Sequence, residues 1–408
     1  MQRRLDASAL CDWADASVAD LIAHAEEING LNVYPVADSD TGTNMLFTMR
    51  SALAETRPGA DVAQAAAALA AGAAHGARGN SGVILAEILR ALADVTAEAA
   101  TDSDLTDIDA ELLGAALRHA VARTVTAMGG ELVEGTVVSV LRAAAEAVER
   151  SAADGDGVGQ ALAAAGAAAA DALENTPEQL RVLAEAGVVD AGGRGLLVLL
   201  DALTVTVTGH APDRRRYPPA EAGEPIAASA APEFEVMYLL NARDAVSVDA
   251  LRSCLEHLGD SVAVSAAAAG SYSVHVHADD AGAAIEAGMA AGAVSRIRIA
   301  GLATGRVAPG GWSRDRAVLA VVDGEGAAEL FGSEGAFVLR PDPDLVDPAN
   351  GVSAAELLRG VVDTGAAQVM VLPNGYVAAE DLVAGCTAGI GWGIDVVPLP
   401  CGSMVQGL

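Results

Sequence analysis

The chain has 408 residues, of which 52% are hydrophobic and 19% are charged, and its formal net charge at pH 7 is -31. This length accommodates two or three folded domains, and this composition is typical of chains that bury a core. The negative charge argues against nucleic acid and anionic membranes as partners, because both bind through clustered Lys and Arg. The sequence contains no lysine, which excludes a P-loop lysine and a Schiff-base lysine.

Cysteine usage and hydropathy indicate the compartment. The 4 cysteines are scattered and form no C-x-x-C pair, and the N-terminal residues contain no apolar signal-peptide core. A reducing cytoplasm is the simplest compartment for such a chain. Apolar runs such as AQAAAALAAGAAHGA are rich in Ala and Gly and too weakly hydrophobic to cross a bilayer core of about 30 Å. We predict no membrane span.

The first half of the chain, from about residue 5 to residue 207, has a helical pattern. Apolar residues recur at spacings of three to five from Leu10 to Ile28, and later stretches repeat this habit with abundant alanine. Alanine-rich faces allow close helix packing. We therefore predict an all-helical bundle whose glycine-bearing turns gather at one end.

Two carboxylates stand close together in the turn VYPVADSDTGTNM, residues 33–45. Asp38 and Asp40 repel each other unless a cation lies between them, and hard oxygen ligands suit magnesium shared with substrate phosphates. Taken alone, this D-x-D pattern is more typical of acidic turn residues that bond their own backbone. With a metal present, Thr43 and Asn44 would follow the turn as contacts to phosphate or metal-bound water.

Three further glycine-bearing segments adjoin helical patterns: GARGNSG at 76–82, EGT at 134–136 and GVVDAGGRG at 187–195. Glycine at a helix start lets backbone N–H groups approach an anion, and the helix N-terminus favours negative charge. Each segment alone is more typical of a turn between helices. Four such segments in one helical domain favour a phosphate-binding site for a nucleotide.

A Pro-rich stretch from Gly209 to Glu233 indicates an interdomain linker, in which Arg214, Arg215 and Arg216 are best interpreted as a solvated charge run rather than an anion site. The following residues, to about Trp312, alternate in the order strand, helix, strand, strand, helix, strand. This order predicts a small α+β sandwich of ferredoxin type. Strands that alternate with helices from residue 313 to residue 408 predict a parallel α/β sheet.

His275 and His277 have the period-two spacing of a strand, which puts both imidazoles on one face as a usable pair of metal ligands. Two ligands do not complete a site. The alternative, two histidines that hydrogen-bond at the sheet surface near Asp279 and Asp280, is about equally favoured.

The blocks LNVYPVADSDTGTNM, GARGNSGVILAEILRAL, VEGTVVSVLRAAAEA and TPEQLRVLAEAGVVDAGGRGLLVLLDAL, and later SVHVHADDAG and VVPLPCGSMVQGL, resemble the catalytic subunits of fatty acid kinases, a group within the dihydroxyacetone kinase L-subunit family. The likeness spans nearly the whole chain. It implies an antiparallel helical barrel over 1–208 that binds ATP and Mg²⁺ at one end. A linker at 209–232, a middle α+β domain at 233–312 and a C-terminal α/β domain at 313–408 follow.

The resemblance also implies an activity and partners. A fatty acid would arrive on a separate fatty-acid-binding carrier protein, docked by the middle and C-terminal domains, and leave as an acyl phosphate; a homodimer is plausible. A carboxylate acceptor needs no general base, and no obvious base adjoins the motifs, since His24 and His75 are typical structural histidines. Two alternatives stay open: a kinase for dihydroxyacetone or another small alcohol, and a non-catalytic nucleotide-binding scaffold.

By resemblance, Asp38 and Asp40 hold magnesium. The family's third aspartate is replaced by Val33, and Asn32 or, less favoured, Asn29 substitutes for it. The remaining nucleotide contacts implied in this way are Thr43, Asn44, Gly79, Asn80, Ser81, Gly82, Thr136, Asp190, Gly192 and Gly193.

The chain departs from the family pattern at two further places. Ser39 stands where Gly is usual, and a positive φ there would cost about 1 kcal/mol. Glu235 occupies the position of a cysteine that would complete a zinc site with His275 and His277; Cys254 is the other candidate ligand. Arg78 and Arg194 lie in motif loops and are candidates for steadying transferred charge or for surface positions.

Overall fold

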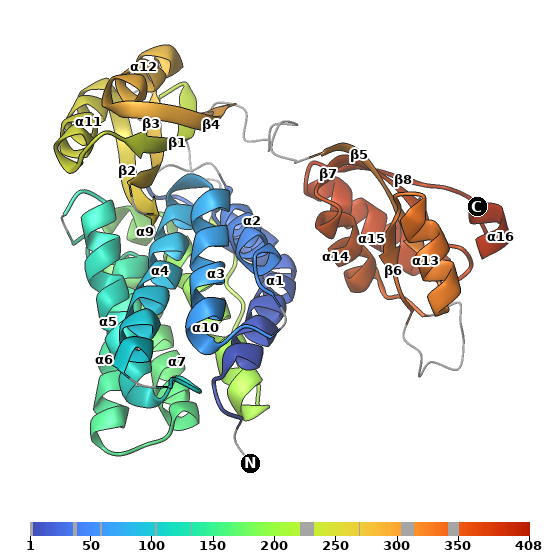
Figure 1. The fold of residues 1–408 in the computed structure, drawn as a ribbon, viewed down its shortest axis with the longest axis horizontal. Helices are drawn as coiled ribbons and strands as arrows, with labels where there is room; N and C mark the ends of the chain where they lie inside the picture. Colours follow the sequence, from blue (N-terminus) through green and yellow to red (C-terminus); the bar gives the residue numbers. More distant parts are fainter. Residues whose placement is uncertain are drawn as a thin grey trace. The chain divides into compact units, whose positions relative to one another are not determined.

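A computed structural model describes residues 3–35, 39–57, 59–102, 104–130, 132–220, 232–268, 270–302, 314–341 and 351–408. The chain divides into two compact units, Met1–Gly305 and Arg306–Leu408. The larger unit holds a helical part and a smaller α/β part, and the second unit is α/β throughout (Figure 1).

The helical part confirms the predicted all-helical N-terminal region. Its helices are α1 (Ala7–Gly30), α2 (Thr41–Ala54), α3 (Val62–Gly76), α4 (Gly79–Asp102), α5 (Ala110–Ala127), α6 (Val137–Ala153), α7 (Val158–Glu174), α8 (Thr176–Gln179), α9 (Arg181–Ala186) and α10 (Ala191–Thr208). Each helix from α1 to α7 packs on the next, and α10 packs against α1, α6 and α7. The first and last helices of the helical part therefore lie side by side.

Local sequence explains where these helices begin and how closely they pack. Asp6, Asp61 and Asp109 precede α1, α3 and α5, and each side chain accepts a hydrogen bond from a backbone N–H of the first turn. A Cβ atom at Gly72 would lie 2.2 Å from the backbone oxygen of Ser51, so only glycine lets α3 approach α2 this closely.

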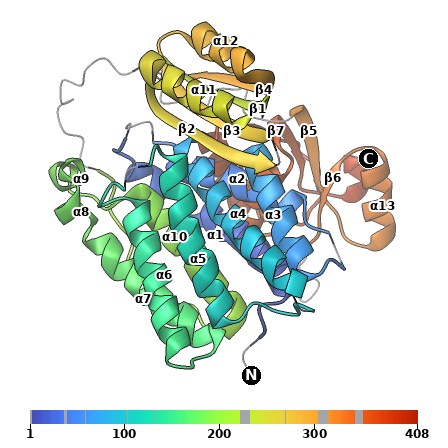
Figure 2. The same cartoon turned by 60° about the vertical axis from the view of Figure 1, so that its left-hand side comes forward.

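The smaller α/β part of the first unit consists of β1 (Phe234–Ala242), α11 (Ala245–Leu258), β2 (Gly259–Ala268), β3 (Ser271–Ala278), α12 (Ala281–Ala291) and β4 (Gly292–Gly301). Its sheet has the order β2-β3-β1-β4, and all pairs are antiparallel. Both helices lie over one face of the sheet (Figure 2). Val236, Leu240, Val274 and Val276 form the core under these helices. Because side chains alternate along a strand, Glu235, Met237, His275 and His277 occupy the other face.

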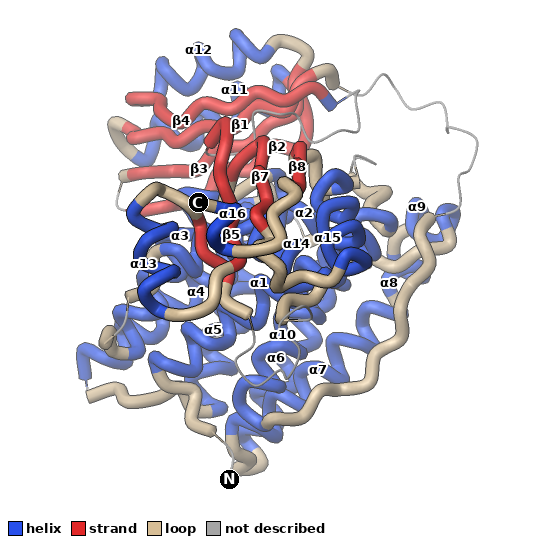
Figure 3. The backbone as a smooth tube through the Cα atoms, turned by 90° about the vertical axis from the view of Figure 1, so that its right-hand side faces the viewer, coloured by secondary structure: helices blue, strands red, loops and turns tan. Residues whose placement is uncertain are grey.

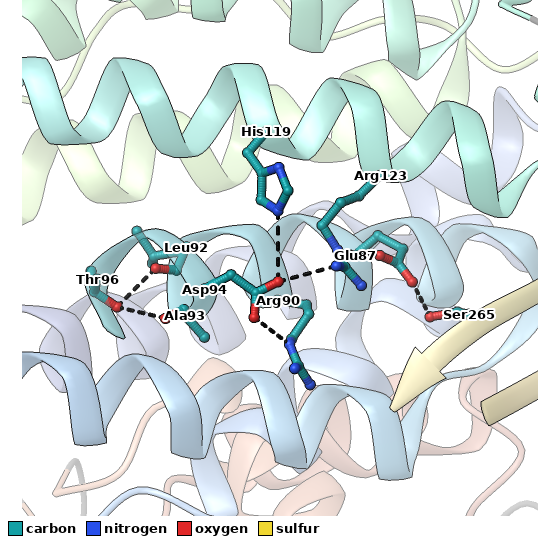
Figure 4. Close-up of polar contacts among 9 residues, drawn as sticks. All are labelled: Glu87, Arg90, Leu92, Ala93, Asp94, Thr96, His119, Arg123 and Ser265. Carbon is teal, nitrogen blue, oxygen red and sulfur yellow. Dashed lines mark hydrogen bonds and ion pairs between the residues drawn. The ribbon is translucent and has the colours of Figure 1, made fainter. Parts of the chain in front are cut away.

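A polar network joins the helical part to this sheet (Figure 4). Glu87 of α4 pairs with Arg123 of α5 (Nε to Oε2, 2.7 Å) and accepts a hydrogen bond from Ser265 of β2. Arg123 also pairs with Asp94 at 3.1 Å. Arg252 of α11 donates to the backbone oxygens of Ala127 and Val264. The α/β part is thus fixed to α4 and α5 by charge-assisted bonds.

The predicted linker is described as far as residue 220, and two of its arginines differ in exposure. Arg214 donates to both carboxylate oxygens of Asp201 at 2.9 Å, and both side chains are largely buried. Arg215 pairs with Glu174, but its side chain is 63% exposed. The interpretation as solvated charge is therefore wrong for Arg214, because its partner lies on α10, and it agrees with the exposure of Arg215.

The second unit confirms the predicted α/β organisation of the C-terminal region. Its elements are β5 (Arg314–Val321), α13 (Glu325–Ser333), β6 (Phe337–Leu339), α14 (Ala354–Asp363), β7 (Ala366–Leu372), α15 (Ala379–Gly391), β8 (Asp395–Pro398) and α16 (Met404–Gly407). The sheet order is β6-β5-β7-β8, with parallel pairing throughout. Figure 3 shows the short strands and the helices between them.

One described helix, α10, is long and apolar enough to cross a membrane by length and composition alone, but 72% of that stretch is buried inside the structure. It packs among the other helices of the first unit.

Candidate functional site

A cavity of about 530 Å³ opens where the first turns of α2, α4, α6 and α10 come together. Its polar lining comes from these helix starts, and the N-terminus of a helix favours negative charge. Deeper in the helical part its walls are apolar. The lining residues on which the argument depends are Thr41, Asn80, Ser81, Thr136, Asp190 and Gly192 on the polar side, and Met45, Ile84, Leu85, Ile88, Val138 and Leu196 on the apolar side.

The turn before α2 carries the predicted metal ligands. Asp38 lies outside the described residues. Ser39 has φ 56, the positive value expected at a position that glycine usually fills. Asp40 is the N-cap residue of α2, but Asn29 caps the helix instead: its side-chain oxygen accepts from the backbone N–H of Gly42 at 2.7 Å. Asn32 is buried, and of the two asparagines Asn29 has the structural role in the helix start.

Thr43 and Asn44 lie behind the cavity and are not part of its described lining. The hydroxyl oxygen of Thr43 accepts from Asn29 Nδ2 at 2.9 Å. The Asn44 side chain packs against Gly79, where a Cβ atom would lie 2.4 Å from Asn44 Nδ2. Both residues therefore contact the starts of helices, Thr43 through Asn29 and Asn44 through Gly79.

The start of α4 faces the cavity with Asn80 and Ser81. The Oδ1 atom of Asn80 is buried and has no hydrogen-bond partner among the described residues, and Ser81 Oγ lies 3.4 Å from Thr41 Oγ1. Gly79 has φ 54, and a Cβ atom at Gly82 would lie 2.4 Å from Thr48 Oγ1. The two glycines thus let α4 pack closely on α2.

Asp190 joins the starts of two other helices. Its carboxylate accepts from the backbone N–H of Gly193 at 2.7 Å, and the backbone N–H of Val137 also hydrogen-bonds to it. Burial raises the pKa of Asp190 to about 6, although both bonds act in the opposite direction. Thr136, directly before α6, donates its hydroxyl to Val133 O. The Asp190 carboxylate therefore organises this wall of the cavity.

A further wall of the cavity comes from the α/β part of the first unit. The sequence did not predict that these residues line the cavity. Glu256, at the end of α11, and residues 259–262, at the start of β2, line it. Ser261 has φ 54, a strained value for serine, at an irregularity in the pairing of β2 with β3. Asp260 lies 3.8 Å from the Nδ1 atom of His277. No local signal in the sequence connects this segment to the glycine-bearing turns.

Glu235, His275 and His277 lie together on the face of the sheet opposite its helices, with their ligand atoms within 4.8 Å of one another. Burial, then His277, keeps the pKa of His275 well below its ordinary value, so the ring is neutral, as a metal ligand requires. Neither ring nitrogen of His275 has a hydrogen-bond partner among the described residues. Cys254 is exposed on α11 and is not part of this group.

The remaining candidate residues, Arg194, His24 and Arg78, make contacts within the first unit. Arg194 is 2% exposed and pairs with Glu27 at 2.9 Å, so it is structural. His24 bonds the same carboxylate at 2.9 Å. Burial raises the pKa of Glu27, but these bonds outweigh it and lower the value to about 2. Arg78 stacks on the ring of Phe47 with its Cζ atom 3.7 Å from the centroid.

Three parts of the chain match known protein families. Residues 35–205 match the DAK2 domain, which places the chain among the dihydroxyacetone-kinase-like proteins. Residues 231–306 match the FakA-like middle domain, and residues 317–408 match the FakA-like C-terminal domain, both of the fatty acid kinase type. The chain therefore consists of a DAK2 domain followed by a FakA-like middle domain and a FakA-like C-terminal domain.

Individual proteins are also similar to this chain. Protein YloV of Bacillus subtilis is 28% identical over 403 residues, covering 91% of this chain and 70% of that protein. An uncharacterized protein of Staphylococcus saprophyticus is 27% identical over 441 residues, covering all of this chain and 76% of that protein. Among solved structures, the dihydroxyacetone kinase from C. freundii in complex with AMP-PNP and Mg²⁺ is similar with a TM-score of 0.38 and 18% identity, over 50% of this chain and 35% of that chain.

Proposed function

We propose that this protein is the ATP- and Mg²⁺-dependent subunit of a fatty acid kinase. It would transfer the γ-phosphoryl group to the carboxylate of a fatty acid that a separate carrier protein presents, in the cytoplasm, and release an acyl phosphate. The observation that carries the proposal is the convergence of four helix starts on one cavity. A volume of about 530 Å³ is suitable for a nucleotide, and helix N-termini are ready-made phosphate sites.

In this proposal the start of α4 binds the β- and γ-phosphates. Ser81 donates its hydroxyl, and the side-chain amide of Asn80, whose Oδ1 atom has no partner among the described residues, donates through its NH₂ group once turned. Thr136 and the starts of α6 and α10, held by Asp190, close the opposite wall with Gly192 and Gly193. Thr43 and Asn44 support the turn.

Asp40, with Asp38 and Asn32, would hold magnesium beside these phosphates. The residues fit, because carboxylate and amide oxygens are the ligands that magnesium accepts, and because Asn29 rather than Asp40 caps α2. These residues would hold an ion that supplies positive charge against the negative charge developing during transfer. The protein's own contribution is positioning and electrostatics, since a carboxylate acceptor is already ionised at neutral pH.

Glu235, His275 and His277 would hold a zinc ion. One buried neutral imidazole without a hydrogen-bond partner among the described residues, a second imidazole and a carboxylate form a suitable donor set. Glu235 of β1 and the two histidines of β3 would hold the ion between these paired strands.

A second candidate function, transfer to a small alcohol such as dihydroxyacetone, is favoured by one observation. A hydroxyl acceptor needs a general base, and Asp260, paired with His277, lines the cavity.

The test is product formation from Mg-ATP, a fatty acid and a lipid-loaded carrier, with dihydroxyacetone as the parallel acceptor. The wild type is compared with Asp38→Ala/Asp40→Ala and with Asp249→Ala, an exposed aspartate of α11, as matched control. Acyl phosphate that requires the carrier, and that disappears only in the double variant, would support the proposal. ATP binding without product, with a carrier that another kinase accepts, would favour a non-catalytic scaffold.

A further inference from the structure

The segment that follows α10, residues 209–220, returns along the helices toward the cavity, and we call it the strap. Helix α10 begins at the cavity wall and is 18 residues, or about 27 Å, long. Along the strap, the contacts move back toward the cavity. Arg214 pairs with Asp201 in the middle of α10 at 2.9 Å, and Ala220 donates its backbone N–H to the oxygen of Gly30, the last residue of α1, at 2.8 Å. The strap is therefore attached to the helical part along its length.

Glu27, in the last turn of α1, holds both the strap and α10. Its side chain is 8% exposed and accepts from the backbone N–H of Tyr217 at 3.1 Å and from Nε of Arg194, in the first turn of α10, at 2.9 Å. The hydroxyl of Tyr217 donates to Glu174 of α7 at 2.6 Å. Hydrogen bonds to carboxylates are stronger than those between neutral groups, so Tyr217 is fixed to α1 and α7 together.

The strap meets the end of α1 in close contact. A Cβ atom at Gly30 would lie 2.9 Å from the Cβ atom of Pro219. Pro219 is the second of two consecutive prolines, which stiffen the backbone, so the strap cannot easily yield at this point. Asn29, directly before Gly30, caps α2 by accepting from the backbone N–H of Gly42 at 2.7 Å. Neighbouring residues of α1 therefore contact the strap and cap α2.

We propose that the strap positions the nucleotide site. Through Tyr217 and Pro219 it holds the end of α1 where Asn29 caps α2, and it thereby fixes the turn that carries Asp40. Residues 209–220 do not line the cavity, so Tyr217 and Pro219 are positioning residues and not ligands. The effect on magnesium and nucleotide depends on the proposed function, whereas the connection from the strap to the start of α2 does not.

The first test follows hydrogen exchange of the backbone amides of Gly42 and Thr43, which both donate to Asn29 Oδ1. These amides report directly whether the cap of α2 is intact, and they do so without any ligand. Exchange in the middle of α5 is the internal reference for the stability of the helical part.

Two variants disturb the strap in different ways, so either one that stays folded is sufficient. In Gly30→Ala the added Cβ atom pushes against Pro219, and Tyr217→Ala removes the ring and its hydroxyl. Arg216→Ala, at an exposed residue of the strap, is the matched control. We expect exchange at the two α2 amides to increase about tenfold in both variants and to stay unchanged in the control. Unchanged exchange in both variants, or an equal increase in the control, would overturn the proposal.

The second test separates positioning from a general loss of stability. Calorimetry measures the affinity of the full chain for ADP with Mg²⁺ and with EDTA. Gly30→Ala and Tyr217→Ala should weaken Mg-ADP binding about tenfold and leave ADP binding in EDTA unchanged, because the turn before α2 carries the proposed magnesium ligands. Tyr217→Phe, which keeps the ring and the backbone N–H, should retain most of the affinity for Mg-ADP.

The outcomes distinguish the strap from the proposed function. An equal loss of affinity with and without Mg²⁺ would overturn the proposal, since it would indicate general destabilisation, and so would an unchanged affinity for Mg-ADP in both variants. If the wild type binds no Mg-ADP, the proposed kinase function fails, and exchange at Gly42 and Thr43 still decides whether the strap positions the start of α2.

Discussion

Replacement of Glu87 by alanine tests how firmly the two parts of the first unit are joined. The Glu87 side chain is 3% exposed and accepts from Arg123 at 2.7 Å as well as from Ser265. Removing one member of a buried ion pair costs about 3 to 5 kcal/mol, because the remaining charge stays buried without its partner. Arg123 keeps Asp94 at 3.1 Å, so we expect the lower end, about 3 kcal/mol.

The measurement is urea unfolding, with hydrogen exchange of residues 259–268 as the local readout of β2. Ser265→Ala should cost about 1.5 kcal/mol, the contribution of a hydrogen bond to a charged group, and should increase exchange in β2 more than in α4. The double variant should be less destabilised than the sum of the single variants by about 1 kcal/mol. A loss below about 1 kcal/mol in Glu87→Ala would refute the reasoning, since the carboxylate would then contribute no more than an exposed ion pair.

Three further predictions concern single side chains and a matched glycine pair. The raised pKa of Asp190 means that the wild type should lose stability relative to Asp190→Asn as pH rises from about 4 to 6, by about 3 kcal/mol; equal pH profiles in urea unfolding would contradict this. Gly72→Ala should destabilise the protein by about 2 kcal/mol or more, because the added Cβ atom overlaps the backbone. Gly332→Ala, with open space around it, should leave the stability unchanged, and thermal unfolding of both variants is the measurement. Arg214→Ala should lower the free energy of unfolding by about 1 to 2 kcal/mol. In a double-mutant cycle with Asp201→Asn, the coupling energy should account for most of this loss, and a coupling energy near zero would argue against the pair.

Much of the fold could be predicted from local sequence. Helical periodicity, aspartate caps and the alternation of apolar strands with helices depend on neighbouring residues, and the helical first part and the α/β second part followed from them. The positive φ at Ser39 agrees with the resemblance to the family, which usually has glycine between the two aspartates, and does not follow from local sequence.

The rest depends on contacts between residues far apart in the chain. The bond from Ser265 to Glu87 joins positions 178 residues apart, and the pair of Arg194 with Glu27 joins positions 167 apart. None of these residues carries a local signal for its partner. The glycines were predicted to admit phosphate, but Gly82 also accommodates the Thr48 hydroxyl, a requirement that appears only once α2 and α4 are packed.

The position of residues 259–262 in the cavity wall has a consequence for biosynthesis. The four helix starts belong to the first half of the chain and emerge from the ribosome earlier, and N-terminal segments generally fold first. At that stage the cavity lacks the wall that β2 supplies. A nascent chain that ends before β2 would therefore leave this side of the cavity open, with Leu85 and Leu196 among its apolar lining residues.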